Sequence, residues 1–355
     1  MMNIKKVSVN TALPGKARAR ILIIYTGGTF GMTYDREGVL VPFDFADILH
    51  ELPTLKNLAL EITAFSFVKP IDSSNISIEH WQLIGKIIFE QYEHQDGFVV
   101  LHGTDTMAYT TSALSFMLEG LQKPVVFTGA QLPISEARSD AREHLITALD
   151  IASARKDGFA LVPEVCIYFD YELLRGNRSK KVESMQFDAF DSGNYPPLAK
   201  AGVKIDYNFS VIRSATSSTG LTLRSKFETN IAILKLFPGI DINVVKAVLA
   251  VPGLKAVVIE TYGSGNAPTL PWLLEEIKKA IERGIIVLNI SQCPGGRVTQ
   301  GRYETSKGLQ QIGVISGADM TTEAAIPKLM LLIGELGIDR AKQLIGTSLA
   351  GELTA

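Results

Sequence analysis

The chain of 355 residues contains little cysteine and has no strong charge of either sign. Its two cysteines, Cys166 and Cys293, lie far apart, which favours two reduced thiols over a disulfide or a metal-binding pair. Lysine and arginine number 35 and aspartate and glutamate 37, so the formal net charge is −2. No broad basic field is present, and we therefore expect neither nucleic acid nor an anionic membrane as a partner.

Long apolar runs and several cofactor motifs are also missing. No stretch of about 18 apolar residues predicts a membrane span, and the N-terminus has no apolar run typical of a signal peptide. Neither the phosphate-binding G-x-x-x-x-G-K-S/T pattern nor the dinucleotide pattern G-x-G-x-x-G occurs. Histidines at ligand spacing are absent as well, so we expect no metal and no cofactor. Residues 1–19, which are basic, are expected to form a flexible tail.

What the sequence does contain is an alternation of short apolar runs and helical patterns. Several runs are continuously apolar, as in strands that are covered on both faces of a mostly parallel sheet. Helices are expected to begin near Ser77 and Asp105 and to cover 139–154 and 270–283. This alternation predicts the α/β class. The expected strands are 21–25, 98–102, 124–128, 165–169, 231–236, 255–261 and 285–290.

The length of the chain predicts two domains. Residues 207–228 are rich in serine and threonine and are interpreted as an interdomain linker. The predicted domains are then a large N-terminal α/β domain over 20–206 and a smaller α/β domain over 229–355. The polar stretch 176–197 is expected to be a long functional loop of the first domain.

Two threonine-rich turns follow buried strands directly. Thr26-Gly27-Gly28-Thr29 follows the run 21–25, and Gly103-Thr104-Asp105-Thr106 follows 98–102. Ligands of open α/β sheets bind beyond the carboxyl ends of the strands, so both turns are expected to face one crevice. Each turn alone also fits a simpler interpretation, a tight glycine turn or a helix cap at Asp105.

Two further polar clusters accompany these turns. Asp72-Ser73-Ser74-Asn75 fits either a capped turn or a grip on the charged ends of an amino acid. The basic run 175–181 ends in Lys181, which would help to activate a threonine hydroxyl, although a solvated loop is the simpler interpretation. His102 is interpreted as a structural histidine, and the other four histidines are given no role.

Taken together, these pieces resemble the bacterial cytoplasmic, or type I, L-asparaginases. The resemblance extends from about Arg20 to Glu352, and the two threonine motifs are specific to that superfamily. The matching segments are Tyr25-Thr26-Gly27-Gly28-Thr29-Phe30-Gly31-Met32, 101–109, Asp72-Ser73-Ser74, Arg175-Gly176-Asn177-Arg178, Tyr262-Gly263-Ser264-Gly265-Asn266-Ala267-Pro268 and Gly317-Ala318-Asp319-Met320-Thr321.

The resemblance implies hydrolysis of the side-chain amide of L-asparagine to L-aspartate and ammonia, without a cofactor. Thr29 matches the primary nucleophile, and Thr104, Asp105 and Lys181 match a second triad that activates water. Substrate-binding residues are implied at Asp72, Ser73, Thr104, Asp105 and Asn266. The resemblance also implies a Rossmann-like C-terminal domain, a cytoplasmic location, and a homodimer or homotetramer with the active site at the protomer interface.

The tyrosine that activates the nucleophile in many relatives has no counterpart, because its matching position here is Val39. Tyr303 and Tyr34 are the candidates to replace it, and Tyr303 is preferred. We expect Tyr303→Phe to reduce turnover far more than Tyr34→Phe.

A second departure concerns regulation. Some relatives bind asparagine at an allosteric site through an arginine, and the matching position here is Glu260. A carboxylate cannot hold an α-carboxylate in the same way, so we expect non-sigmoidal or otherwise altered kinetics.

Three alternatives remain open from the motifs. A glutaminase would use the same residues, because one methylene changes the free energy of binding by only about 1–3 kcal/mol. A relative that acts with glutamyl-tRNA usually has an extra N-terminal domain, whereas about 20 residues precede the first expected strand here. A non-catalytic amino-acid-binding module would need Asp72, Ser73 and Asp105, but would not need Thr29 and Lys181.

Overall fold

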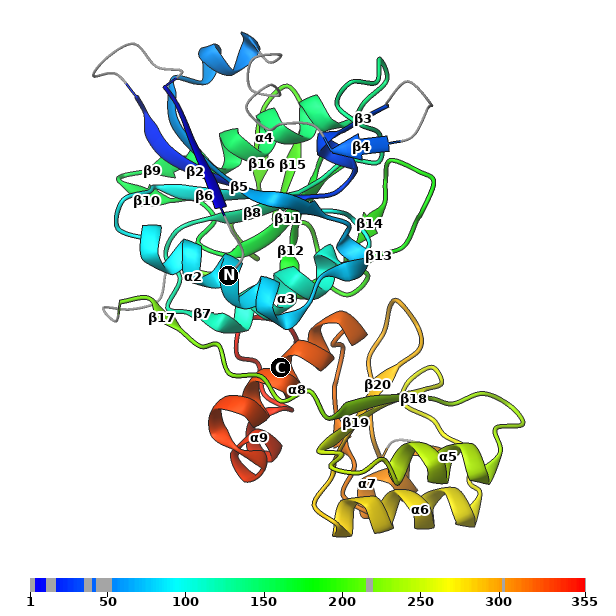
Figure 1. The fold of residues 1–355 in the computed structure, drawn as a ribbon. Coiled ribbons are helices and arrows are strands. Elements are labelled where there is room, and N and C mark those ends of the chain that lie inside the picture. Colours follow the sequence, from blue (N-terminus) through cyan, green and yellow to red (C-terminus); the bar gives the residue numbers. More distant parts are fainter. Residues whose placement is uncertain are drawn as a thin grey trace. The chain divides into compact units, whose positions relative to one another are not determined.

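The computed structural model describes residues 4–10, 17–34, 40–42, 53–214, 220–301 and 304–354 (Figure 1). The chain divides into two compact units. The first comprises Met1–Ser192 and Pro196–Leu223, and the second Gly193–Tyr195 and Arg224–Ala355. The division after Leu223 falls inside the segment that the sequence predicts as a linker, while the domain bounds 20–206 and 229–355 stay predictions.

The first unit is built on a nine-stranded sheet of order β1-β5-β2-β6-β8-β11-β12-β15-β16. The central strands from β5 to β11 are parallel, and β1, β12, β15 and β16 pair antiparallel at the two sides. The sheet is thus mostly parallel, which confirms the predicted class. The strands are β1 (Ile4–Asn10), β2 (Ala19–Gly27), β5 (Leu60–Ile71), β6 (Gly97–Leu101), β8 (Val125–Thr128), β11 (Val165–Phe169), β12 (Glu172–Arg175), β15 (Ala199–Ala201) and β16 (Ile205–Tyr207).

Helices cover both faces of this sheet, which explains why β6, β8 and β11 are buried along their whole length. All five residues of β6 are buried, and so are all four of β8. The helices α2 (Ile78–Gln91) and α3 (Met107–Met117) lie on one face, and α4 (Ala141–Ser153) lies on the other (Figure 1). Since the steps from β6 to β8 and from β8 to β11 run in the same direction, the α3 and α4 crossovers have opposite hands. One of them departs from the usual right-handed rule.

The second unit is a smaller parallel sheet of order β18-β19-β20-β21, also covered on both faces. Along β19, Val257 and Ile259 pack into one apolar cluster and Ala256 and Val258 into another. The elements are β18 (Ile231–Lys235), α5 (Ile242–Leu249), β19 (Ala256–Thr261), α6 (Pro271–Glu282), β20 (Ile286–Ser291), α7 (Glu304–Gln311), β21 (Ile315–Ser316), α8 (Thr322–Leu336) and α9 (Ile338–Leu344).

Short elements complete the described chain. They are the 3₁₀ turns η1 (Thr29–Gly31), η2 (Pro53–Leu58), η3 (Ser73–Asn75) and η4 (Gly176–Arg178), and the strands β3 (Met32–Tyr34), β4 (Leu40–Pro42), β7 (Leu118–Glu119), β9 (Arg155–Lys156), β10 (Phe159–Ala160), β13 (Lys180–Lys181), β14 (Phe190–Asp191) and β17 (Thr222–Leu223). Within the described ranges, no helix combines the length and apolar character that crossing a bilayer requires.

The flexible tail predicted for residues 1–19 is wrong for Ile4–Asn10. These residues form β1, which pairs antiparallel with β5 at the edge of the sheet, with Ile4 opposite Phe67. In the sequence, polar and apolar residues alternate from Lys6 to Asn10, a pattern typical of a β-strand. The basic charge of the segment, which suggested a solvated tail, does not prevent that pairing.

Candidate active site

The turn 26–29 leaves β2 in a conformation that requires both of its glycines. Gly27 and Gly28 have φ of +129° and +85°, which residues with a side chain rarely adopt. A methyl group on Gly27 would lie 2.3 Å from the Ile71 nitrogen, and one on Gly28 would lie 2.6 Å from Gly103 Cα. The turns after β2 and β6 are therefore in direct contact, while the crevice that both are expected to face stays a prediction.

The two threonines of this turn have different surroundings. Thr26 is buried, and its hydroxyl donates a hydrogen bond to the Leu101 carbonyl (3.0 Å), which ties β2 to β6. Thr29 begins η1 and is half-buried. Of the two hydroxyls, that of Thr29 is the one that remains available for chemistry.

The turn 102–106 after β6 packs against the polar cluster 72–75 after β5. A methyl group on Gly103 would lie 2.6 Å from Ser73 Oγ, and Thr106 Oγ1 donates to the Ser73 carbonyl (2.7 Å). Ser73 is buried, whereas the side chains of Asp72 and Asp105 are exposed. Three turns at one edge of the sheet thus bring together two carboxylates and several hydroxyls.

Lys181 joins this group from a short hairpin. It lies on β13 opposite Phe190 of β14, and its Nζ donates to Thr104 Oγ1 and Asp105 Oδ1, both at 2.7 Å. The lysine side chain is 17% exposed and that of Asp105 62%, so the contact is open to solvent on the side of Asp105. Thr104, Asp105 and Lys181 therefore form one connected cluster.

Asp72 caps the first turn of η3. Its Oδ1 accepts hydrogen bonds from the Ser74 backbone nitrogen (2.9 Å) and the Ser74 hydroxyl (2.8 Å). The backbone bond, followed by the hydroxyl bond, lowers the pKa of Asp72 below its ordinary value. The carboxylate is therefore ionised and fixed in direction, which suits it to bind a cation.

His102 makes internal contacts that fit its interpretation as a structural residue. It is buried, and burial lowers its pKa to about 4, so the ring is neutral near pH 7. Nδ1 lies 2.7 Å from the Gly103 carbonyl and Nε2 lies 3.0 Å from Thr110 Oγ1, which accepts from the indole nitrogen of Trp81 (3.1 Å). The ring thus links α2 and α3 to the Gly103 turn.

One polar residue beside Thr104 is missing from the candidates that the sequence supplies. Gln131 Oε1 lies 3.5 Å from Thr104 Oγ1, and its Nε2 donates to the Gln186 carbonyl (2.8 Å). Gln131 lies in the turn after β8, the strand next to β6 in the sheet. The sequence contains only a weak signal for Gln131. It is a polar residue two positions after Gly129, which ends an apolar run.

Three other candidates are not placed in this cluster. Tyr303 and Val39 lie outside the described residues, and Tyr34 is described only as the backbone residue opposite Leu40 in the β3–β4 pair. Asn266 belongs to the second unit, where it forms a backbone bridge with Tyr262. The roles of Tyr303, Tyr34 and Asn266 stay predictions.

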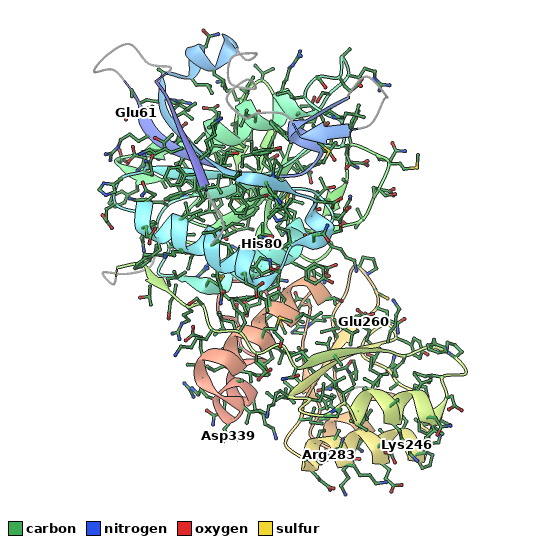
Figure 2. All side chains as sticks on the ribbon, in the orientation of Figure 1. Glu61, His80, Lys246, Glu260, Arg283 and Asp339 are labelled. Atoms are coloured by element: carbon green, nitrogen blue, oxygen red, sulfur yellow. The ribbon has the colours of Figure 1, made fainter. Side chains whose placement is uncertain are left out.

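Glu260, also in the second unit, lies near the carboxyl end of β19 (Figure 2). Its Oε1 accepts a hydrogen bond from Thr322 Oγ1 (2.6 Å), and its Oε2 lies 3.4 Å from Lys235 Nζ. The side chain is thus held by neighbours of its own unit.

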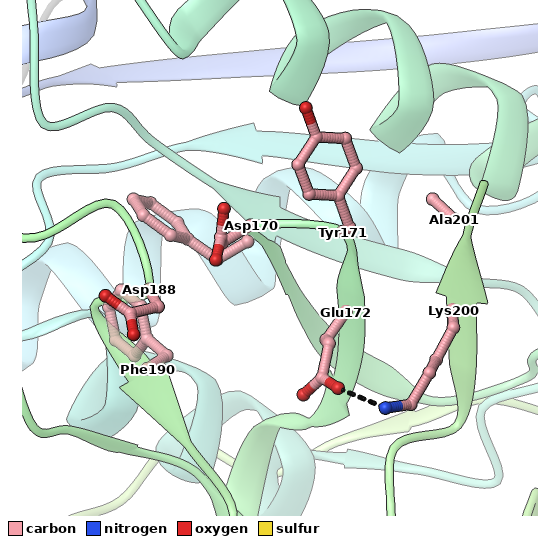
Figure 3. A pocket seen from close by; sticks show the side chains of 8 residues that line it. Asp170, Tyr171, Glu172, Asp188, Phe190, Lys200 and Ala201 are labelled. Atoms are coloured by element: carbon pink, nitrogen blue, oxygen red, sulfur yellow. Dashed lines mark ion pairs between the residues drawn. The ribbon is translucent and has the colours of Figure 1, made fainter.

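A cavity of about 390 Å³ in the first unit is not part of this cluster. It is lined by residues such as Asp170, Asp188 and Lys200, and it shares none with the three turns (Figure 3). The site is therefore defined by the turns and not by the size of this hollow. Among the described residues, no group of three or more His, Cys, Asp or Glu side chains is arranged to hold a metal ion.

Known proteins match both units. The family model "Asparaginase, N-terminal" matches residues 20–213, and "Glutaminase/Asparaginase C-terminal domain" matches residues 230–343. L-asparaginase 1 of Escherichia coli K12 is 40% identical over 337 residues, which cover 94% of this chain and 98% of that protein.

A solved structure and a human protein are also similar to this chain. The crystal structure of L-asparaginase I from Vibrio cholerae superposes with a TM-score of 0.86 at 39% identity, covering 96% of this chain and all of that one. The human 60 kDa lysophospholipase is 42% identical over 94% of this chain, which spans 61% of the human protein's length. With both family models matched in order and the turns arranged as described, the chain belongs to the asparaginase family.

Proposed function

We propose that this protein hydrolyses the side-chain amide of L-asparagine to L-aspartate and ammonia. The observation that carries the proposal is the cluster in which Lys181 Nζ lies 2.7 Å from both Thr104 Oγ1 and Asp105 Oδ1, beside the Thr29 turn. A member of the asparaginase family with this cluster has the groups that a two-step amide hydrolysis needs.

In the first step Thr29 acts as the nucleophile. Its hydroxyl oxygen forms a bond to the amide carbon and its proton passes to a base. The carbon–nitrogen bond then breaks as the amide nitrogen takes up that proton and leaves as ammonia. The product is an ester of Thr29. Backbone N–H groups of the turns would stabilise the tetrahedral oxyanion, although that of Gly28 already donates to the Ile71 carbonyl (3.1 Å).

In the second step the Thr104, Asp105 and Lys181 cluster directs a water molecule at that ester. The water oxygen bonds to the ester carbon, the bond to Thr29 breaks, and aspartate leaves while Thr29 regains its proton. Here Lys181 donates to Thr104, and the Thr104 hydroxyl can in turn donate towards the Gln131 amide oxygen (3.5 Å).

The charged ends of the substrate fit the remaining groups. The exposed carboxylates of Asp72 and Asp105 suit the α-ammonium, and the Ser73 hydroxyl suits the α-carboxylate. The same groups would hold glutamine, so a preference for asparagine rests on the family and not on these contacts. We propose that Asn266 and the activating tyrosine, Tyr303 before Tyr34, complete the site.

Assembly and location are proposals of the same kind. The resemblance to type I enzymes supports a homodimer or homotetramer with a shared active site, in the cytoplasm. The absence of nucleic-acid and membrane partners is also proposed, because a formal net charge of −2 provides no broad basic field to attract either.

The test is ammonia release from asparagine, glutamine and short β-aspartyl amides by Thr29→Val and Thr29→Ser. Valine keeps the shape of threonine without the hydroxyl, so we expect turnover to fall by at least about 10³-fold, whereas serine retains part of it. Asparagine binding, measured by calorimetry, should persist in Thr29→Val. Equal turnover in the wild type and Thr29→Val would refute the proposed nucleophile, and no ammonia from any amide would refute the function.

A further inference from the structure

The turn 129–132, which follows β8, borders the Thr104 turn directly. A methyl group on Gly129 would lie 2.4 Å from the His102 carbonyl oxygen and 3.5 Å from Thr104 Cγ2. Gln131 of the same turn brings its Oε1 to 3.5 Å from Thr104 Oγ1. The position of this turn therefore sets where the Gln131 amide oxygen lies relative to the Thr104 hydroxyl, which also accepts from Lys181 Nζ (2.7 Å).

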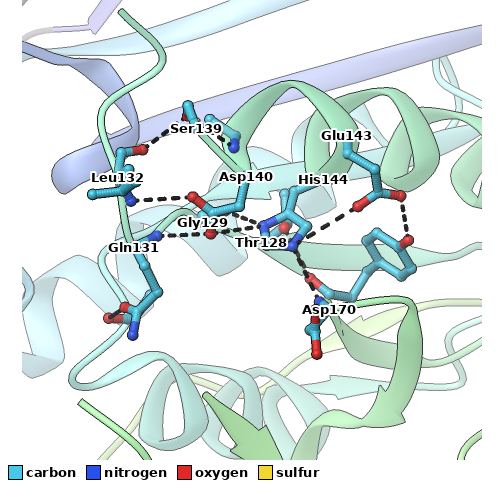
Figure 4. A network of polar contacts seen from close by, with 12 residues as sticks. Thr128, Gly129, Gln131, Leu132, Ser139, Asp140, Glu143, His144 and Asp170 are labelled. Atoms are coloured by element: carbon cyan, nitrogen blue, oxygen red, sulfur yellow. Dashed lines mark hydrogen bonds and ion pairs between the residues drawn. The ribbon is translucent and has the colours of Figure 1, made fainter. Parts of the chain in front are cut away.

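Two side chains from the first turns of α4 hold the turn in place (Figure 4). The carboxylate of Asp140, the residue before α4, accepts from the backbone nitrogens of Gln131 (2.9 Å) and Leu132 (3.1 Å). One helical turn later, His144 Nδ1 lies 2.9 Å from the Gly129 carbonyl oxygen. Both ends of the turn are thus anchored to one helix.

The partners of His144 determine where its proton lies. Nε2 is 3.1 Å from the backbone nitrogen of Asp170, in the turn between β11 and β12. A backbone N–H can only donate and a carbonyl oxygen can only accept, so Nε2 accepts and Nδ1 donates. His144 is therefore the neutral Nδ1–H tautomer, because a proton on Nε2 would point at the Asp170 N–H, and two donors cannot form a hydrogen bond.

The acidic groups beside the ring are already engaged elsewhere. Asp140 Oδ2 lies 3.6 Å from Nδ1 but accepts from the Gln131 nitrogen, and Glu143 Oε2 lies 3.8 Å from Nε2 while its Oε1 accepts from Tyr168 OH (2.6 Å). The imidazole is 2% exposed and packs against the Phe169 ring at 4.3 Å between centroids. Packing and hydrogen bonds together leave the ring one orientation.

We propose that His144 is a positioning residue for the hydrolysis proposed above, on which this inference rests. Its Nδ1–H holds the Gly129 carbonyl and so keeps the Gln131 side chain against the Thr104 hydroxyl. Of the groups proposed to bind the ends of the substrate, Asp72 and Ser73 belong to a different turn, and Asp105 is held by Lys181 (2.7 Å) and not by Gln131. Loss of the Nδ1–H contact therefore lowers kcat and leaves KM nearly unchanged.

Two variants separate the two hydrogen bonds of the ring. In His144→Asn the amide nitrogen takes the place of Nδ1 and keeps the donor to Gly129. In His144→Gln the longer side chain keeps an acceptor for the Asp170 N–H and loses that donor. We expect His144→Asn to stay within about threefold of the wild-type kcat and His144→Gln to lose about 10- to 100-fold, since a small misplacement near the reacting groups has effects of this size.

Thermal unfolding of both variants provides the matched control. Each loses one buried hydrogen bond, so both should show a similar decrease in Tm. If both fold with lowered Tm and wild-type kcat, His144 is a structural residue and the inference is wrong. It is also wrong if His144→Asn loses as much turnover as His144→Gln.

A measurement independent of activity tests the tautomer in the wild-type protein. Nitrogen-15 NMR of the histidine rings should show the His144 proton on Nδ1, and a proton on Nε2 or on both nitrogens would overturn the inference even if neither variant folds. If the wild type releases no ammonia but carries the Nδ1–H tautomer, the proposed function fails while the anchoring of the turn stands.

Discussion

At the scale of single residues, the site depends on short polar side chains whose direction is fixed by neighbouring hydrogen bonds. Asp72 is the clearest example, because the Ser74 nitrogen and hydroxyl both donate to its Oδ1. These bonds stabilise the charged carboxylate and lower its pKa. The proposed contact with the α-ammonium of the substrate therefore persists to a lower pH than it would with an uncapped aspartate.

Removal of the Ser74 hydroxyl should make the enzyme more sensitive to acid. In Ser74→Ala one of the two hydrogen bonds is lost, so the pKa of Asp72 rises towards its ordinary value. As the pH falls, the carboxylate then becomes protonated earlier, and the acid limb of kcat/KM moves to higher pH. Pre-steady-state or steady-state ammonia assays over a pH series measure this shift.

Ser74→Thr, which keeps a hydroxyl, is the matched control and should leave the acid limb in place. Asp72→Asn should raise KM at every pH because it removes the charge itself. An acid limb that is the same in Ser74→Ala and the wild type would show that a group other than Asp72 sets it.

Residue types and their placement after strands predict that the polar turns lie close together, and the structure places these turns in contact. That their side chains form the active site stays a prediction. Thr29, Asp72, Ser73, Thr104 and Asp105 all follow apolar runs, and the carboxyl ends of parallel strands share one edge of a sheet. The contacts of Gln131 and His144 could not be predicted in this way. They depend on where α4 packs and on a hairpin, β11–β12, whose turn brings a backbone N–H to the imidazole.

At the scale of elements, continuous apolar runs were the reliable signal. All seven expected strands are confirmed, from β2 and β6 to β20. Most of them are covered on both faces and leave no polar alternation to misread, whereas β18 lies at the edge of its sheet and is partly exposed. The four expected helices are confirmed as α2, α3, α4 and α6. The strands β1, β15 and β16 were missed. The partner of β1 is β5, which is distant in the sequence, and β15 and β16 are only three residues long each.

A buried ion pair stabilises the segment around β12 and η4, which precede Lys181 in the chain. Arg175 at the end of β12 donates to Glu164 through Nε (2.6 Å) and Nη2 (3.0 Å), and both side chains are at most 4% exposed. Glu164 Oε1 also accepts from the Arg213 nitrogen (2.6 Å), and Arg175 Nη2 donates to the Val211 carbonyl (2.9 Å). The pair thus fixes the start of η4 and the chain after β16.

Glu164→Gln should destabilise the protein strongly, because it leaves the arginine charge buried without its counter-charge. We expect the free energy of unfolding to fall by about 3–5 kcal/mol, measured by urea denaturation. The control is Glu172→Gln, whose partner Lys200 is exposed, and it should leave stability nearly unchanged. Similar losses in both variants would mean that burial of the Arg175–Glu164 pair does not increase its contribution to the free energy of unfolding.

At the scale of the whole molecule, the chain supplies two units that each match a family model, and the proposed chemistry is concentrated in the first. The second unit carries Asn266, proposed to complete the site, and Glu260, which the resemblance to type I enzymes matches to the effector-binding arginine of some relatives. Communication between sites requires that an effector bind one state better than another. The surroundings of Glu260 therefore bear on whether this protein responds to asparagine cooperatively.

Glu260 is occupied by its own neighbours, since Thr322 donates to one carboxylate oxygen and Lys235 faces the other. A negative charge held in this way repels the α-carboxylate of a second asparagine, so we expect the rate to follow asparagine concentration with a Hill coefficient near one. Glu260→Gln should leave the shape of that curve unchanged, because the carboxylate serves its own unit and not an effector. Initial rates over a wide range of asparagine concentrations, at several protein concentrations, measure both.

A Hill coefficient well above one in the wild type would mean that effector binding proceeds through other residues. Loss of that cooperativity in Glu260→Gln would assign Glu260 the regulatory role that we argue it lacks.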